Sequence, residues 1–148
     1  MTQLVLGSDH GGLELKTQLK TYLQAQYPHL TLEDVGTYSN DSCDYPDYAD
    51  SLCESILSGQ SQLGILCCGT GIGISMRANR HKGIRAAVVH SEFTAKMTKA
   101  HNNANVLCLG GRTSTIEDAQ SWVSIWLDTE FEGGRHQRRL EGLDKVTS

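Results

Sequence analysis

The sequence is poor in proline, in basic charge and in long apolar runs, and each shortage excludes a class of protein. Only two prolines, Pro28 and Pro46, occur in 148 residues, so no proline-rich linker is indicated, and this length predicts one domain over residues 1–148. Thirteen Lys and Arg against seventeen Asp and Glu give a net charge of −4, which argues against a nucleic-acid binder that must displace phosphate counterions. No apolar run approaches the ~20 residues of a membrane span, so no membrane partner is expected.

A secretory signal and a disulfide framework are also missing. The amino-terminal residues MTQLVLGSDH have neither a basic segment nor a long apolar one, so we expect a cytoplasmic protein. Five cysteines are an odd number and form no CxxC pair, which favours reduced thiols over disulfides or paired metal ligands. The cysteines are Cys43, Cys53, Cys67, Cys68 and Cys108.

Short apolar runs alternate with stretches of helical period. The runs are bounded by Gly, Asp, Asn or Ser, which predicts strands at residues 4–6, 31–35, 63–67, 84–89 and 106–109. Apolar residues at helical spacing predict helices over residues 15–26, 49–57 and 116–126, with shorter helices at 74–79 and 91–100. This order predicts an α/β fold of three layers, a five-stranded parallel sheet with helices on both faces. Residues 135–145, after Gly133-Gly134, predict a C-terminal helical tail that packs on a neighbour.

Reactive residue types gather just after the predicted strands, where open α/β sheets bind ligands. The glycine loop Gly69-Thr70-Gly71-Ile72-Gly73 opens the predicted helix 74–79, and its backbone N–H groups suit an anion. Its spacing fits neither the P-loop nor the dinucleotide fingerprint. The structural alternative is a tight turn between strand and helix.

Cys68 stands at the predicted strand-to-helix corner, where a helix amino terminus stabilises a thiolate. Such a thiolate suits a nucleophile or a general base, whereas the commonest fate of a free cysteine is burial as a small apolar residue. We expect that burial for Cys43, Cys53, Cys67 and Cys108, with Cys67 pointing to the opposite side of the strand from Cys68.

Further titratable groups have a functional and a structural interpretation. Asp9 and His10 end the first strand and could exchange protons with a ligand, although the alternative is that Asp9 caps the next helix. His101 follows the helix 91–100 and could be present for the helix dipole alone.

Arginines near the glycine loops would suit a phosphate dianion. Arg112 ends the fifth strand, and Arg135 and Arg139 are four residues apart on one predicted helix face. The alternative is a solvated basic surface, which we prefer for Arg138. The residues alone thus predict a small α/β domain that handles a phosphorylated metabolite by acid–base chemistry.

Several motifs together resemble one enzyme family, which includes the B-type ribose-5-phosphate isomerases and the allose- and galactose-6-phosphate isomerases. The matching stretches span nearly the whole chain in the family's order: GSDHGG (7–12), DYPDYA (44–49), CCGTGIGIS (67–75), KGIRA (82–86), AHNNANVLCLGGR (100–112) and EGGRHQRR (132–139).

The resemblance implies a Rossmann-like fold and aldose–ketose isomerisation of D-ribose 5-phosphate and D-ribulose 5-phosphate through an enediol(ate). Cys68 matches the base that moves a proton between C2 and C1. A second branch of the family uses a Glu at the place of Ile74, so this sequence resembles the cysteine branch. Thr70 matches the anion hole, together with the amides of residues 71–73. His101 matches the group that opens the sugar ring, and Asp9 matches a shuttle for the sugar-oxygen protons. The matched substrate contacts are Asp9, His10, Tyr45, Gly69, Thr70, Gly71, Ile72, Gly73, Asn102, Arg112, Arg135 and Arg139.

The resemblance also implies no metal, no other cofactor, and a homodimer or a dimer of such dimers. Sites then lie at the interface, with the tail of about residues 133–148 packed there. Three alternatives stay open: a six-carbon sugar phosphate as substrate, a non-catalytic sugar-phosphate sensor, and a thiol redox protein using Cys67-Cys68. The redox alternative needs a strained vicinal disulfide.

Overall fold

Strands and helices alternate in the computed structural model, which describes residues 2–147. The strands are β1 (Gln3–Ser8), β2 (Thr31–Asp34), β3 (Leu63–Cys68), β4 (Ala86–Val88) and β5 (Val106–Gly110). The helices are α1 (Leu13–Gln26), α2 (Tyr45–Leu57), α3 (Ile72–Ala78), α4 (Glu92–Ala100), α5 (Ile116–Asp128) and α6 (Arg135–Leu143), and a short 3-10 turn, η1 (His10–Gly12), precedes α1.

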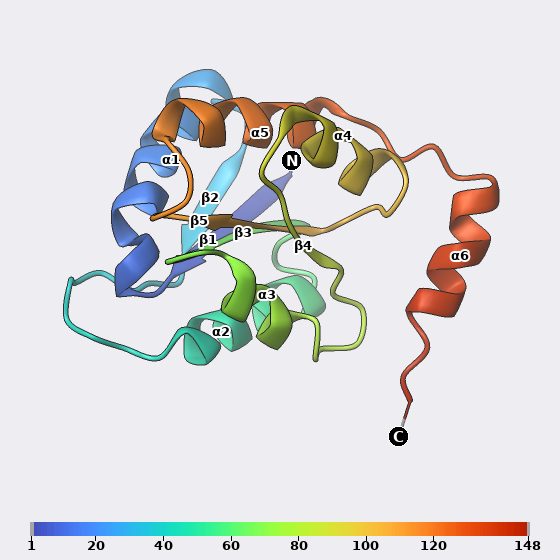
Figure 1. The fold of residues 1–148 in the computed structure, drawn as a ribbon, viewed down its shortest axis with the longest axis horizontal. Coiled ribbons are helices and arrows are strands. Elements are labelled where there is room, and N and C mark those ends of the chain that lie inside the picture. The colour runs from blue at the N-terminus through green and yellow to red at the C-terminus, as the bar shows by residue number, and fades with distance from the viewer. Residues whose placement is uncertain (1, 148) are drawn as a thin grey trace.

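The strands form one parallel sheet in the order β2-β1-β3-β5-β4 (Figure 1). The register pairs Ser8 with Cys67 and Cys68 with Gly110, so β1, β3 and β5 end side by side. Their interior positions explain why the sequence of each reads as an apolar run, since parallel strands are covered on both faces.

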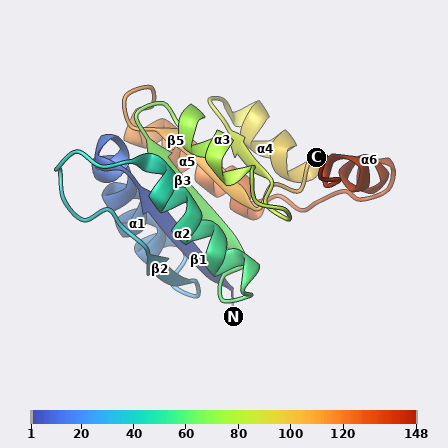
Figure 2. The same ribbon diagram turned by 90° about the horizontal axis from the view of Figure 1, so that it is seen from below.

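Helices cover both faces of the sheet, which confirms the predicted three-layer fold (Figures 1 and 2). One core cluster joins the sheet to α1, α4 and α5 and includes Trp126, and the other joins it to α2 and α3 and includes Leu52. Cys67 belongs to the first cluster and Cys68 to the second, as the alternation of side chains along a strand predicts. No helix within residues 2–147 combines the length and apolar character needed to cross a membrane.

Two of the elements that differ from their predicted bounds have a clear physical reason for the difference. Strand β4 begins at Ala86 rather than at residue 84, because the N–H of Arg85 donates to the Asn105 side chain at 2.8 Å instead of to a neighbouring strand. Helix α3 begins at Ile72 rather than at residue 74, after Gly71 takes a positive φ of 81°. The glycines of this loop conceal the first helical turn, because glycine is a poor helix former.

Helix α6 stands apart from the layered body, beyond β4 (Figures 1 and 2). It ends at Leu143, two residues before the predicted bound. Its Arg85–Asp144 ion pair, at 3.2 Å, ties the end of the helix to the loop that precedes β4. The end of the tail is therefore attached to its own chain, whereas its packing on a neighbouring chain stays a prediction.

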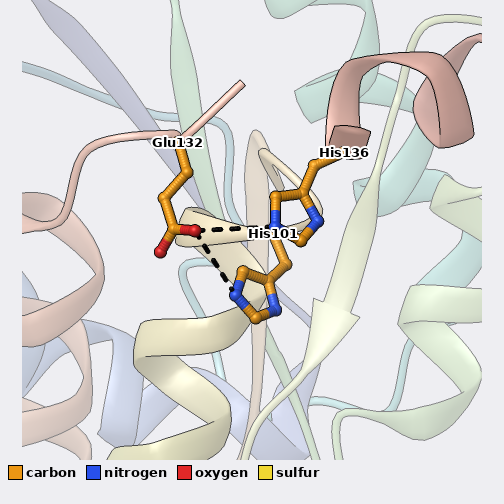
Figure 3. A group of neighbouring side chains, drawn as sticks. All are labelled: His101, Glu132 and His136. Atoms are coloured by element: carbon orange, nitrogen blue, oxygen red, sulfur yellow. Dashed lines mark ion pairs between the residues drawn. The ribbon is translucent and has the colours of Figure 1, made fainter. Parts of the chain in front are cut away.

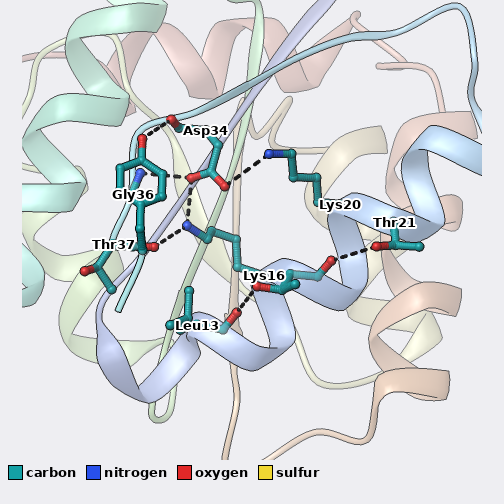
Figure 4. A network of polar contacts seen from close by, with 9 residues as sticks. Leu13, Lys16, Lys20, Thr21, Asp34, Gly36 and Thr37 are labelled. Atoms are coloured by element: carbon teal, nitrogen blue, oxygen red, sulfur yellow. Dashed lines mark hydrogen bonds and ion pairs between the residues drawn. The ribbon is translucent and has the colours of Figure 1, made fainter. Parts of the chain in front are cut away.

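A buried lysine fixes the loop after β2 to α1 (Figure 4). Lys16 is 1% exposed, and its Nζ donates to Asp34 Oδ1 at 2.7 Å and to the carbonyl of Thr37 at 2.6 Å. The same loop continues the sheet next to the end of β1, because the amide of Thr37 donates to the carbonyl of Ser8 and the amide of Ser8 donates to the carbonyl of Gly36, both at 2.7 Å. Lys16 thus holds Thr37 in place, and Thr37 in turn pairs with Ser8, the residue before Asp9.

Replacing Lys16 with methionine should lower the free energy of unfolding by about 3 kcal/mol, because it leaves the Asp34 carboxylate largely buried without its main cation. The matched control is Lys20→Met, since Lys20 is 38% exposed and reaches Asp34 only at 3.5 Å. We expect that control to cost under about 1 kcal/mol, as an exposed ion pair does. Urea denaturation of both variants measures the difference in their free energies of unfolding. Equal losses of stability would show that burial of the Lys16–Asp34 pair does not cause the larger effect.

Candidate active site

Three strand ends are joined into one edge by backbone hydrogen bonds. The amide of Asp9 donates to the carbonyl of Cys67 at 3.2 Å, and that of Gly111 donates to the carbonyl of Cys68 at 2.8 Å. The amide of Arg112 donates to the carbonyl of Gly69 at 2.9 Å. The structure therefore brings together the residues predicted after the first, third and fifth strands. We call this edge the carboxyl-edge group: Asp9, His10, Cys68, the glycine loop 69–73, Tyr45 and Arg112.

The Cys68 thiol lies at the last position of β3, against the beginning of α3. Its side chain belongs to a buried cluster but remains 5% exposed. The amide of Gly71, which caps α3, donates to Cys68 Sγ at 3.1 Å. This hydrogen bond holds the sulfur in a fixed position at the amino terminus of α3. Gly71 is required for this turn, because its φ is 81° and a Cβ there would lie 3.0 Å from the backbone of Leu109.

The glycine loop offers fewer free amides than the sequence predicts. The N–H of Gly71 is directed at Cys68, and that of Ile72 donates to Thr70 Oγ1 at 3.2 Å. Among residues 2–147 we find no hydrogen bond from the amide of Gly73. Tyr45 lies over this position, since a Cβ on Gly73 would be 2.8 Å from Tyr45 Cζ. Thr70 is itself exposed, so its hydroxyl and the Gly73 amide are two donors of the loop that could serve a ligand.

Asp9 and His10 are held in defined orientations. Asp9 is 7% exposed and caps η1, because its Oδ1 accepts from the Gly12 amide at 3.1 Å. The structural alternative for Asp9 is thus realised, and it still leaves Oδ2 without a hydrogen bond among the described residues. The amide of Cys43 donates to His10 Nδ1 at 3.3 Å, which places the proton of a neutral imidazole on Nε2. The prediction that Cys43 is buried in the core is wrong, since it is half-buried beside His10.

A pocket of about 500 Å³ opens beside this edge. His10 and Arg112 line it together with Glu14 and Gln18 of α1. Arg112 also leans over the glycine loop, because a Cβ on Gly69 would lie 3.3 Å from its Nη1. The imidazole N–H and the guanidinium suit the oxygens of a phosphorylated ligand.

The other predicted residues lie at the opposite end of the sheet. His101 caps the end of α4, and Asn102 follows it shortly before β5 begins at Val106. The register pairs Val106 with Gly64 at the start of β3, whereas Cys68 is the last residue of that strand. The two ends are thus about 13 Å apart along the strand, at roughly 3.3 Å per residue. His101, Asn102, Arg135 and Arg139 form the amino-edge group, which does not meet Cys68 within one chain.

Two residues without a predicted role join His101 there (Figure 3). The rings of His101 and His136 stack with centroids 4.2 Å apart and planes 13° apart. Glu132 Oε1 lies 3.7 Å from His101 Nε2 and 3.5 Å from His136 Nε2. Burial lowers the pKa of His136, and the nearby His101 lowers it further, so the neutral imidazole is favoured. In the sequence only the four-residue spacing of Glu132 and His136 could have indicated this cluster.

The remaining cysteines have the environment of core residues. Cys53, Cys67 and Cys108 are fully buried, as predicted. Burial raises the pKa of Cys53 to about 12, and it raises the pKa values of Cys67 and Cys108 as well. Cys67 and Cys68 face opposite sides of the sheet, which opposes a disulfide between them.

Comparison of the chain with known proteins identifies its family. A model of the ribose/galactose isomerase family matches residues 4–143. The chain belongs to the ribose/galactose isomerase family. Ribose-5-phosphate isomerase B of Escherichia coli is 38% identical over 146 residues, with 99% of this chain and 97% of that protein covered.

Solved structures of ribose/galactose isomerase relatives have the same fold. A ribose 5-phosphate isomerase of Thermotoga maritima is 46% identical with a TM-score of 0.94, over 98% of this chain and 99% of that chain. Ribose-5-phosphate isomerase B of Mycoplasma genitalium, with bound ribulose 5-phosphate, is 40% identical with a TM-score of 0.91, over 97% and 94% of the two chains. The expected Rossmann-like α/β fold and the expected family are therefore confirmed, and the protein is an isomerase.

Proposed function

We propose that the protein interconverts D-ribose 5-phosphate and D-ribulose 5-phosphate through an enediolate, without a metal or other cofactor. The observation that carries this proposal is the Cys68 thiol, which receives the Gly71 N–H at 3.1 Å at the edge that also holds Asp9 and Arg112. Relatives named as B-type ribose-5-phosphate isomerases, one with ribulose 5-phosphate bound, support the choice of sugar.

Cys68 is the base of the proposed reaction. Its thiolate takes the proton from C2 of the open-chain aldose, and the electron pair of that C–H bond forms the C1=C2 double bond of the enediolate. The resulting thiol then gives its proton to C1, which completes the ketose. Ile74, at the place of the Glu in the other branch, is buried and has no group that can accept or donate a proton in the reaction. Cys68 is therefore the group that supports this step.

The negative charge on the enediolate needs donors that are already in position. The Thr70 hydroxyl and the amide of Gly73 are suitable donors in the loop, while the Gly71 amide donates to the sulfur. The reaction also moves a proton from O2 to O1. The free Oδ2 of Asp9 is suited to this transfer, because its other oxygen is fixed by the Gly12 amide.

The complete site requires two copies of the chain, and we propose a homodimer. The amino-edge group holds His101, which opens the sugar ring, and the exposed Arg135 and Arg139, which bind phosphate together with Arg112. Because this group lies at the other end of the sheet from Cys68, each site takes it from the partner chain. Exposed apolar side chains on the first turns of α3 and α4, Ile72 and Phe93, support a contact surface near the carboxyl edge, with exposures of 50% and 72%.

An isomerase assay with added chelator tests the proposal. We expect the purified protein to form ketose from ribose 5-phosphate in excess EDTA, with a higher kcat/KM than for allose 6-phosphate. Tight binding of both sugars without turnover would instead support a sugar-phosphate sensor. A higher kcat/KM for allose 6-phosphate would replace the five-carbon substrate by a six-carbon one. We also propose a cytoplasmic location, where the five free cysteines would stay reduced.

A further inference from the structure

Three metal-ligating side chains converge where α6 meets the end of α4 (Figure 3). His101, Glu132 and His136 offer ligand atoms that all lie within 4.8 Å of one another. The closest approaches are those of Glu132 Oε1 to the Nε2 atoms of the two histidines, at 3.7 Å and 3.5 Å. Two imidazoles and one carboxylate, with a fourth position open to water, form a ligand set that binds zinc in proteins.

One of these ligands is buried with an unused nitrogen. The side chain of His136 is only 8% exposed, and its Nε2 has no hydrogen-bond partner within the described part of the chain. Such a buried polar atom costs free energy unless it finds a partner. Figure 3 shows this nitrogen pointing toward Glu132, at 3.5 Å, which is too long for a good hydrogen bond. The cluster therefore has a ligand already directed into it.

Backbone hydrogen bonds hold Glu132 and His101 in place. The amide of Glu132 donates to the carbonyl of Ala100 at 2.9 Å, and that of His101 donates to the carbonyl of Met97 at 2.9 Å. Glu132 therefore stays next to His101 although thirty-one positions of sequence separate them. The cluster is thus set by the fold rather than by a chance contact of two long side chains.

We propose that His101, Glu132 and His136 form a binding site for a divalent transition-metal ion of the zinc class, and that the bound ion inhibits the isomerase. Imidazole nitrogens favour such ions over Mg²⁺ and Ca²⁺, which prefer oxygen ligands. The metal occupies Nε2 of His101, the residue assigned to ring opening. The inhibition rests on the proposed function, whereas the binding of the ion does not.

Binding requires a small rearrangement. Zinc lies about 2.0–2.1 Å from its ligand atoms, so the three atoms must approach one another and the stacked rings must tip apart. His101 and Glu132 have side chains that are 36% and 54% exposed and can turn, while the buried His136 stays as the fixed ligand. The nearby cations Arg135 and Arg139 oppose a dication, so we expect reversible binding rather than a permanently occupied structural site.

Zinc and cobalt titrations of the full chain test the proposal. In isothermal calorimetry, Glu132→Gln should weaken Zn²⁺ binding by about tenfold or more, since it removes the only anionic ligand. Glu130→Gln is the matched control, because it makes the same charge change at an exposed position two residues away. Co²⁺ should give the visible absorption of a nitrogen- and oxygen-ligated ion, without the sulfur charge-transfer band that a site at Cys68 or Cys43 would add.

Inhibition is then measured on each variant relative to its own rate without metal. We expect the Zn²⁺ concentration for half-inhibition to rise in Glu132→Gln as the binding constant does, and to stay unchanged in Glu130→Gln. Equal Zn²⁺ affinity in Glu132→Gln, His101→Asn and the parent would overturn the site. A sulfur band lost in Cys68→Ala would overturn it too. Binding at the cluster without any effect on turnover would retain the metal site and contradict its inhibitory role, and an inactive parent that still binds Zn²⁺ there would contradict only the proposed function.

Discussion

Replacing Cys68 with alanine should reduce kcat for ribose 5-phosphate by about 10²–10⁴-fold, the contribution expected of a positioned base. The physical reason is that Cys68 is the group proposed to take the C2 proton, and its sulfur is held in place by the Gly71 amide at 3.1 Å. KM should change far less, since the phosphate and sugar contacts are untouched. Steady-state kinetics, with circular dichroism as a check of the fold, measures both effects.

Cys67→Ala is the matched control for this experiment. The neighbouring thiol makes the same chemical change on the opposite face of β3, inside the core shared with α1 and α5. We expect this variant to lose some stability through a small cavity and to keep its kcat. Near-normal turnover in Cys68→Ala would exclude the cysteine as the base. Equal loss in both variants would assign the effect to packing.

Mixing two inactive variants should restore activity. Cys68→Ala lacks the proposed base and His101→Asn lacks the proposed ring-opening group, and each should be inactive as a homodimer. After mild denaturation and refolding together, half of the dimers are mixed, and each mixed dimer contains one site with both residues intact. The mixture should therefore recover about a quarter of the parent rate, as expected for a two-fold symmetric dimer with two shared sites.

A second pair of variants provides the control. Cys68→Ala mixed with Asp9→Asn should recover nothing, because both changes lie in the carboxyl-edge group and every site in a mixed dimer then carries one of them. Copurification of differently tagged chains shows that mixed dimers have formed. If they form and the first pair stays inactive, His101 and Cys68 do not act across chains.

The strands and the face of each core residue were predictable from sequence, because a parallel sheet covered on both sides produces apolar runs and its side chains alternate. Cys67 and Cys68 show this clearly, since they lie on opposite faces as predicted. Lys16 shows the limit. A pattern of apolar residues treats lysine as exposed, yet its ammonium is buried by Asp34 and a backbone carbonyl that are distant in sequence.

The part of the candidate site at the strand ends was predictable from sequence. The part formed by contacts between helices and loops that are distant in sequence was not. Asp9 follows β1 and Cys68 is the last residue of β3, and because these two strands pair directly, the proximity of the two residues follows from topology. Glu132 and His136 lie beside His101 because the chain after α5 runs back to the end of α4. No local sequence pattern indicates this contact. The engagement of the Gly71 amide by sulfur also depends on the early start of α3, which its glycines conceal.

The proposed division of the site between the two ends of the sheet has a genetic consequence. In the proposed dimer, a chain without Cys68 and a chain without His101 together form one site that has both residues. Two alleles that are each inactive alone should therefore complement each other in one cell, whereas two alleles that are both defective in the carboxyl-edge group should not. Defects in the two groups should thus behave in a genetic cross as if they lay in two different genes.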